Sequence, residues 1–289
     1  METVLRLEGV CKQYADFALR NVSFKLDRGF VMGLIGPNGA GKTTTIKLIM
    51  NLLSRDQGRI ELFGLDNIAH EMTVKEKIGF VYDTVPYYGV LTIGEMKSLI
   101  APFYRQWNES QFQRYLRDFE LNPNQQIDKL SRGMKIKFQL AMSLSHGAEL
   151  IIMDEPTSGL DPVFRSELLD ILYDFILDEG RSVLFSTHIT TDLEKIADYI
   201  TFLNRGEVLF SLPKDELLER YALVKGGLDI LNDGSAAGRL IGVRRGQTGF
   251  SALTADPESL SRHYGSRLTL ERASLDDIMV YLVRGERSV

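Results

Sequence analysis

The sequence predicts an α/β fold: a mostly parallel sheet covered by helices, with a helical block inserted in it. Three observations predict this fold class. Short apolar runs alternate with helical patterns along much of the chain. A glycine-rich turn joins the apolar run 31–35 to a helical pattern over 44–53. A second apolar run, 150–153, ends in two adjacent carboxylates, Asp154 and Glu155.

Each element is predicted from a local pattern. Apolar or alternating runs predict strands over residues 3–7, 18–26, 31–35, 59–63, 77–82, 150–153, 182–185, 199–203 and 207–210. Helical spacing predicts helices over 44–53, 162–176, 191–197 and 214–221. From Thr92 to about His146 the pattern is helical throughout. There Phe112, Tyr115, Leu116 and Phe119 share one helical face.

The last part of the chain has a different character. Gly226, Gly227 and the run 232–235 predict a break in regular structure. Strands are then predicted over 240–243 and 267–270, and a final helix from Ser274. These residues are too few for an independent core, so we expect them to pack on the rest of the chain or on a second copy.

Composition narrows the class of protein. The chain has 289 residues, 44% of them apolar and 25% charged, as in ordinary globular proteins. Its formal net charge of -5 gives no support for a nucleic-acid partner. One cysteine, Cys11, excludes an internal disulfide and fits a reducing compartment. We find no signal-peptide pattern and no apolar run of the ~20 residues that span a bilayer. A cytoplasmic location is expected.

The glycine-rich turn is a phosphate-binding loop. Residues 36–44 have the sequence GPNGAGKTT, which is G-x-x-x-x-G-K-T between a strand and a helix. The glycines allow backbone N–H groups to face a phosphate at a helix N-terminus. Lys42 can reach the terminal phosphates, and the Thr43 hydroxyl can ligate Mg²⁺. The predicted nucleotide-binding residues here are Asn38, Gly39, Ala40, Gly41, Lys42, Thr43 and Thr44.

Five further positions are candidates for the same site. Asp154 ends a core strand, where it can hold Mg²⁺, and Glu155 can polarise an attacking water. His188 ends the next strand and can reach the γ-phosphate edge, although a structural histidine is the alternative. Tyr14 precedes the loop and can stack on adenine or be an ordinary half-buried tyrosine. Asp161 is a further candidate, although an aspartate followed by Pro162 is also a favourable N-terminal cap of a helix.

These pieces resemble the nucleotide-binding domain of ATP-binding-cassette (ABC) transporters over roughly residues 2–220. The resemblance adds Leu130-Ser131-Arg132-Gly133-Met134, similar to the family signature. It implies that Ser131 and Gly133 contact ATP bound to a second cassette, and that Asp161 belongs to a loop at that interface. It also implies a P-loop NTPase core with an N-terminal antiparallel β-subdomain and a small C-terminal α+β extension. The domains would be 1–220, with a helical subdomain at about 84–146, and 221–289.

Two departures from the family pattern stand out. Arg132 and Met134 replace a glycine and a glutamine of the signature, and Arg132 either adds a cation near the phosphate or faces solvent. Asp83 stands where a glutamine is usual. It is a stronger Mg²⁺ ligand but a shorter connection to the helical block.

The resemblance implies an ATPase that uses ATP and Mg²⁺, powers a separate integral-membrane permease and works with a second cassette, identical or paralogous. It would lie at the inner face of the cell membrane. The closest subgroup is of bacterial exporters, which export peptides or antimicrobials. An aromatic loop, 83–91 with Tyr82, is the predicted membrane-subunit contact, with turn packing as the alternative. A soluble ABC-type ATPase in translation or DNA repair, and a non-catalytic regulatory subunit, are the competing hypotheses.

Overall fold

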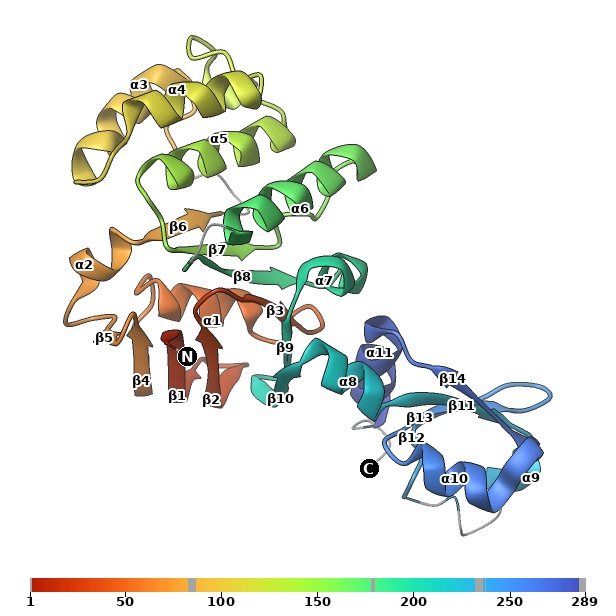
Figure 1. Cartoon of the computed structure of the whole chain (residues 1–289). Helices are drawn as coiled ribbons and strands as arrows, with labels where there is room; N and C mark the ends of the chain where they lie inside the picture. Colours follow the sequence, from red (N-terminus) through yellow and green to blue (C-terminus); the bar gives the residue numbers. More distant parts are fainter. Residues whose placement is uncertain (1, 83–86, 178–179, 232–235, 237, 286–289) are drawn as a thin grey trace.

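A central sheet of six strands organises the chain (Figure 1). The computed structural model describes residues 2–82, 87–177, 180–231, 236 and 238–285. In order across the sheet, the strands are β10 (Glu207–Pro213), β9 (Tyr199–Asn204), β3 (Val31–Ile35), β8 (Ser182–Thr187), β7 (Leu150–Asp154) and β6 (Ile78–Val81). All neighbours are parallel except β10 and β9. The predicted mostly parallel sheet is confirmed.

The inner strands β3, β7 and β8 are buried at every position, and most of their residues are apolar. Along β7, Ile151 and Met153 belong to one buried cluster, and Leu150 and Ile152 to another. This is the alternation that a two-residue side-chain period imposes on a strand covered on both faces. The carboxyl ends of these strands meet at one edge, where polar side chains follow them.

A second, antiparallel sheet lies against one face of the central sheet. Its strands are, in order, β2 (Ala18–Asp27), β1 (Thr3–Gln13), β4 (Gln57–Leu62) and β5 (Leu65–Asp66). Helix α1 (Lys42–Ile49) shares a buried cluster with both sheets, through residues such as Leu7, Ile46 and Met32. This packing fixes α1, and with it the end of the glycine-rich loop.

A block of helices stands beyond β6 and β7 (Figure 1). It consists of α3 (Ile93–Ile100), α4 (Glu109–Asp118) and α5 (Arg132–Ser145), with two short 3-10 turns. Thr92 and Glu95 form a capping box that begins α3. The predicted apolar face of α4 is confirmed, because Phe112 and Leu116 are buried.

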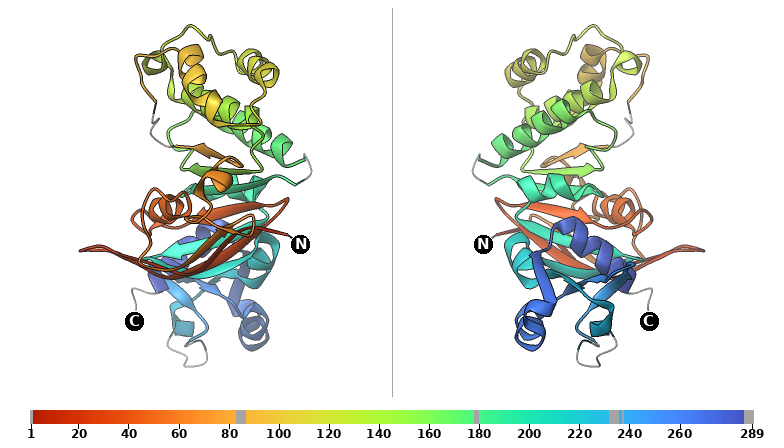
Figure 2. Two further views of the ribbon diagram at one scale, coloured as in Figure 1. Left: turned by 90° about the vertical axis from the view of Figure 1, so that its left-hand side faces the viewer. Right: turned by 90° about the vertical axis from the view of Figure 1, so that its right-hand side faces the viewer.

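After β7 and β8 the chain forms α6 (Pro162–Leu177) and α7 (Thr190–Ile196), and α8 (Lys214–Arg220) follows β10. Residues 222–285 then form what we call the C-terminal module. It lies at the opposite end of the molecule from the helical block in both views of Figure 2. Among the described residues, no helix combines the length and apolar character that crossing a bilayer requires.

The C-terminal module has more regular structure than the sequence predicts. Its antiparallel sheet has the order β12 (Ile241–Arg245), β13 (Phe250–Thr254), β11 (Ala222–Gly226) and β14 (Leu268–Arg272). Its helices are α9 (Leu228–Leu231), α10 (Pro257–Tyr264) and α11 (Leu275–Gly285). Strands β11 and β13 and helices α9 and α10 were not predicted, nor were β5 and the short helix α2 (Glu71–Lys75) that follows it.

The prediction that this region lacks its own core is wrong. Val224, Phe250 and Leu260 belong to a separate buried cluster inside it. The prediction that it packs on the rest of the chain is confirmed by α11, whose Leu275 and Ile278 join the main core. The run 232–235 of the predicted break lies outside the described residues.

His146, just after α5, supplies a test of the fold. The ring is 4% exposed and stacks on Tyr104, with 3.9 Å between ring centroids. Burial lowers the pKa of His146 from 6.5 to about 4. Between these values the unfolded chain binds a proton that the folded chain does not. We therefore expect the free energy of unfolding to fall by roughly 3 kcal/mol as the pH drops from 6.5 to 4.

Guanidinium unfolding of the parent and of His146→Phe, across this pH range, checks the expectation. The phenylalanine keeps the ring stack and cannot be protonated. The variant should therefore lose roughly 3 kcal/mol less stability than the parent between pH 6.5 and pH 4. Equal losses in the two proteins would contradict the burial of a neutral histidine.

Candidate active site

The glycine-rich loop is shaped by close backbone contacts. It runs from the end of β3 to the start of α1. A Cβ on Gly36 would lie 2.0 Å from the Leu203 carbonyl oxygen, and one on Gly41 would lie 2.5 Å from a Leu19 methyl. Gly41 also has φ of +108°, which side chains disfavour. Glycine at these two positions therefore permits the loop to curl over the sheet edge.

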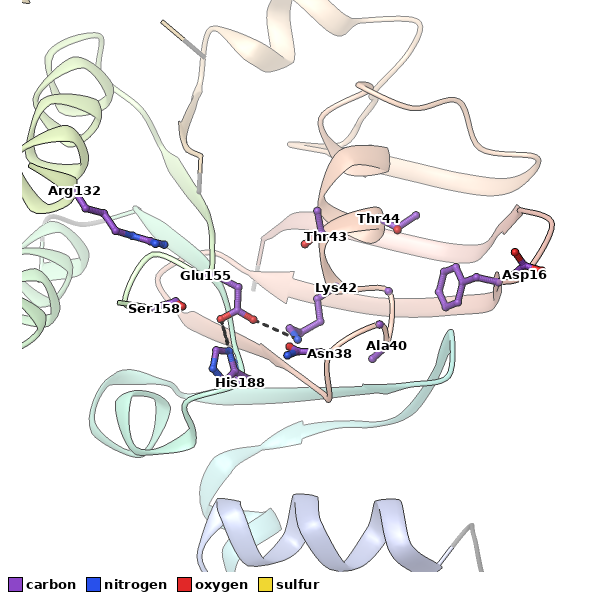
Figure 3. Close-up of a pocket in the computed structure, with 13 residues that line it drawn as sticks. Asp16, Asn38, Ala40, Lys42, Thr43, Thr44, Arg132, Glu155, Ser158 and His188 are labelled. Atoms are coloured by element: carbon purple, nitrogen blue, oxygen red, sulfur yellow. Dashed lines mark hydrogen bonds and ion pairs between the residues drawn. The ribbon is translucent and has the colours of Figure 1, made fainter. Parts of the chain in front are cut away.

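The loop borders a cavity of about 660 Å³. Figure 3 shows the side chains around it, which come from the loop, from the turn between β1 and β2, from the ends of β7 and β8 and the residues after them, and from the start of α5. The lining residues are Asp16, Phe17, Asn38, Gly39, Ala40, Gly41, Lys42, Thr43, Thr44, Arg132, Glu155, Ser158 and His188. All seven predicted loop residues, together with Glu155 and His188, thus meet at one cavity.

Lys42 is the cation at the floor of this cavity. Its Nζ donates to the Gly36 carbonyl oxygen at 2.8 Å and lies 3.3 Å from Glu155 Oε1. Its side chain is 6% exposed. The ammonium is therefore held in a fixed place among the loop's backbone groups, where an anionic ligand of the cavity would meet it.

Glu155 is placed by an unusual backbone conformation. Directly after β7 it has φ of +50°, a left-handed value that is uncommon for non-glycine residues. Its Oε2 lies 2.8 Å from His188 Nδ1 and accepts from the His188 backbone N–H at 3.3 Å (Figure 3). The carboxylate thus lies between Lys42 and His188, where it can take a proton from a water in the cavity.

Asp154 and Thr43 are the predicted Mg²⁺ ligands among the described residues, and Asp154 does not line the cavity. Asp154 is buried, and its Oδ1 accepts a hydrogen bond of 2.6 Å from Ser186 Oγ on the neighbouring strand. This bond fixes the carboxylate and leaves Oδ2 for a further partner. Thr43 lines the cavity. Hard oxygen donors suit Mg²⁺, which takes few protein ligands alongside phosphates. The predicted ligand Asp83 lies outside the described residues.

The aromatic side chain at the cavity is Phe17. Tyr14 lies on the same turn, where its N–H donates to the Phe17 carbonyl, but it is 38% exposed and does not line the cavity. The two rings are 6.4 Å apart. Sequence reasoning missed Phe17, although an aromatic between two strands just before the loop is the same signal that pointed to Tyr14.

The remaining predicted residues gather at a second hollow of about 560 Å³. Ser131, Gly133 and Asp161 line it, at the starts of α5 and α6. Ser131 Oγ accepts from the Met134 N–H, and Asp161 Oδ1 accepts from the N–H groups of Val163 and Phe164. The alternative that Asp161 begins a helix is therefore confirmed. These three residues do not line the loop cavity.

Arg132 lines both hollows. It is the first residue of α5, and its side chain extends toward Ser158 and Glu155 in Figure 3. A Cβ placed on Gly159 would lie 3.4 Å from its Nη1. Of the two interpretations of this arginine, the cation near the phosphate site fits its position better.

The family profile described as "ABC transporter" matches residues 19–158. A bacitracin transport ATP-binding protein (BcrA) of Enterococcus faecalis is 30% identical over 76% of this chain and 72% of its own. A fluoroquinolones export ATP-binding protein of Mycobacterium tuberculosis is 29% identical over 96% of this chain and 92% of its own.

A solved structure of an ATP-binding subunit of an ABC transporter has a TM-score of 0.68. It is 30% identical and covers 75% of this chain and 92% of its own. The chain therefore belongs to the ABC transporter family, as an ATP-binding protein that hydrolyses ATP to power transport.

Proposed function

We propose that the chain powers export of a peptide, an antimicrobial or another amphipathic compound through a separate membrane subunit, with two cassettes enclosing ATP and Mg²⁺. The observation that carries the two-cassette part is the separation of the two hollows. Lys42, Glu155 and His188 line one, whereas Ser131, Gly133 and Asp161 line the other. A second cassette, identical or paralogous, would bring its second hollow against the first cavity.

Each site residue has a role in this proposal. Lys42 and the loop's N–H groups hold the phosphates of ATP. Thr43 and Asp154 hold Mg²⁺, which would neutralise phosphate charge when bound. Glu155 takes a proton from the attacking water while the oxygen of that water bonds to the γ-phosphorus. The bond between the γ-phosphorus and the oxygen that bridges to the β-phosphate breaks, and ADP leaves. His188 orients Glu155. Phe17 or Tyr14 stacks on adenine.

The proposed substrate class is supported by the names of the relatives. The printed names of two relatives refer to bacitracin transport and to fluoroquinolones export. We place the chain at the inner face of the cell membrane, peripheral to its permease.

Its domains would be 1–220, with the helical subdomain at about 84–146, and 221–289. No comparison favours a role in translation or DNA repair, and the formal net charge of -5 offers little to a nucleic acid.

In the described part of the aromatic loop, Tyr87 is packed against the protein and Tyr88 is exposed. Tyr87 packs on Phe138, with 5.3 Å between ring centroids, and burial raises the pKa of its hydroxyl. Tyr88 is 68% exposed. Turn packing therefore explains Tyr87, and the proposed contact with the membrane subunit rests on Tyr88 and on the neighbouring groove. Pro86 lies outside the described residues.

That groove has about 210 Å³ and separates the helical block from the sheet. Tyr82, Tyr87, Ile100 and Tyr104 are among its lining residues. An exposed aromatic beside a groove lined by further aromatics is typical of a protein interface.

Tyr88→Ala is expected to weaken association with the co-expressed membrane subunit about tenfold, because exposed aromatics contribute strongly at interfaces. Affinity of the purified cassette for the subunit in detergent measures it. Tyr173→Ala, which removes an aromatic that is 59% exposed on α6, is the matched control and should bind like the parent. No association of the parent would contradict the transport role, and equal affinities of the two variants would contradict this contact.

A further inference from the structure

Helices α6 and α7 begin beside each other at the carboxyl end of the sheet. Strand β7 leads through Glu155 and the loop 156–161 into α6, and the neighbouring strand β8 leads through His188 into α7. The first loop carries Ser158, which lines the ATP cavity, and Asp161, which lines the second hollow. The start of α7 therefore follows the histidine, and the start of α6 follows the loop between the two hollows.

An ion pair joins the two helix starts. Arg165 Nε on α6 donates to Asp192 Oδ1 on α7 at 2.5 Å, and Arg165 Nη2 donates to Thr191 Oγ1 at 2.8 Å. The Asp192 side chain is 2% exposed and that of Arg165 27%. Such a pair, buried on one side, is costly to break and holds its elements in a fixed relation.

Backbone hydrogen bonds extend the pair to both loops. The Arg165 N–H donates to the Asp161 carbonyl at 3.0 Å, and the Asp192 N–H donates to the Ile189 carbonyl at 3.3 Å. Ile189 directly follows His188. A continuous series of bonds thus runs from Asp161, through Arg165 and Asp192, to the residue beside His188.

The pair also has the groups for a second arrangement. Asp192 Oδ2 is buried and has no hydrogen-bond partner among the described groups. If Arg165 Nη2 left Thr191, it could donate to Oδ2 and form the two parallel bonds that arginine and a carboxylate favour. Two discrete arrangements of one pair are what coupling between two places in a protein requires.

We propose that Arg165 and Asp192 are positioning residues that link the loop 156–161 to His188. The pair holds His188 against Glu155 and transmits to it the position of the loop, so that closure of the second cassette aligns the hydrolytic groups. This inference rests on the proposed two-cassette function. It assigns the pair no contact with ATP.

Arg165→Lys tests the proposal, because lysine keeps the positive charge but cannot reproduce the paired hydrogen bonds of the guanidinium group. We expect kcat for ATP hydrolysis to fall about tenfold and the affinity for ATP, measured with a fluorescent analogue, to stay within about twofold. Arg28→Lys is the matched control. The Arg28 side chain is 25% exposed, close to the value for Arg165. It pairs with Glu149 at 2.9 Å, at the amino end of the central strands, away from the cavity. Its kcat should equal that of the parent.

The same substitution in a chain that already carries His188→Ala distinguishes a positioning role from general destabilisation. If Arg165 acts through His188, Arg165→Lys should cost nothing further in a His188→Ala chain. The same fold-loss in both backgrounds, an unchanged kcat in Arg165→Lys, or a parallel loss of ATP affinity would overturn the proposal. Failure of the parent to associate with a second cassette would instead overturn the proposed function, and light scattering on the parent's Glu155→Gln variant detects that separately.

Discussion

Glu155→Gln is expected to bind ATP like the parent and to lose ATP hydrolysis by about 100-fold or more. Glu155 lies between Lys42 and His188, with its carboxylate oxygens 3.3 Å and 2.8 Å from their nitrogens. Glutamine has nearly the same shape but cannot accept the proton of the attacking water. Binding survives because the phosphates are held by the loop rather than by Glu155.

Single-turnover hydrolysis and equilibrium ATP binding, measured on the same preparation, check this result. Glu149→Gln is the matched control, since Glu149 lies at the other end of the same strand, paired with Arg28 and Lys77. It should hydrolyse ATP like the parent. Hydrolysis by Glu155→Gln at the parent rate would show that another group is the base.

Lys42→Ala is expected to weaken ATP binding by about 100-fold, since it removes a charge-assisted hydrogen bond to phosphate from a poorly solvated place. The Lys42 side chain is 6% exposed and its ammonium is held by the Gly36 carbonyl, so little of the strength of the bond is lost to water. A shortened side chain at this position leaves the loop's N–H groups without the cation that completes the site.

Calorimetric titration with ATP measures this loss. Lys47→Ala removes an exposed lysine from the last turn of the same helix and should bind ATP with the parent's affinity. Unchanged affinity in Lys42→Ala would contradict the role of the phosphate loop.

The parts of the site that the sequence predicts are local in the chain. The loop 36–44 follows a strand whose apolar run is continuous, so both the strand and the turn are visible in one short stretch. Asp154, Glu155 and His188 each end such a run. Because parallel strands end at one edge, their meeting could be predicted without knowing the order of the strands.

The parts that were missed depend on contacts between distant residues. Ser186 fixes Asp154 across neighbouring strands, and Arg165 meets Asp192 across 27 positions. Strand β11 pairs with β13 and β14, which lie far along the chain, so local patterns indicate it weakly. Phe17 rather than Tyr14 lines the cavity because of the turn's geometry, which composition does not determine.

We propose that the two hollows of one chain complete each other in a pair of cassettes. Size-exclusion chromatography with light scattering on Glu155→Gln, with and without Mg-ATP, measures whether such a pair forms. We expect a monomer without nucleotide and a dimer with it, because the blocked site retains ATP between the cassettes. A monomer under saturating Mg-ATP would contradict a composite site formed by two copies of this chain.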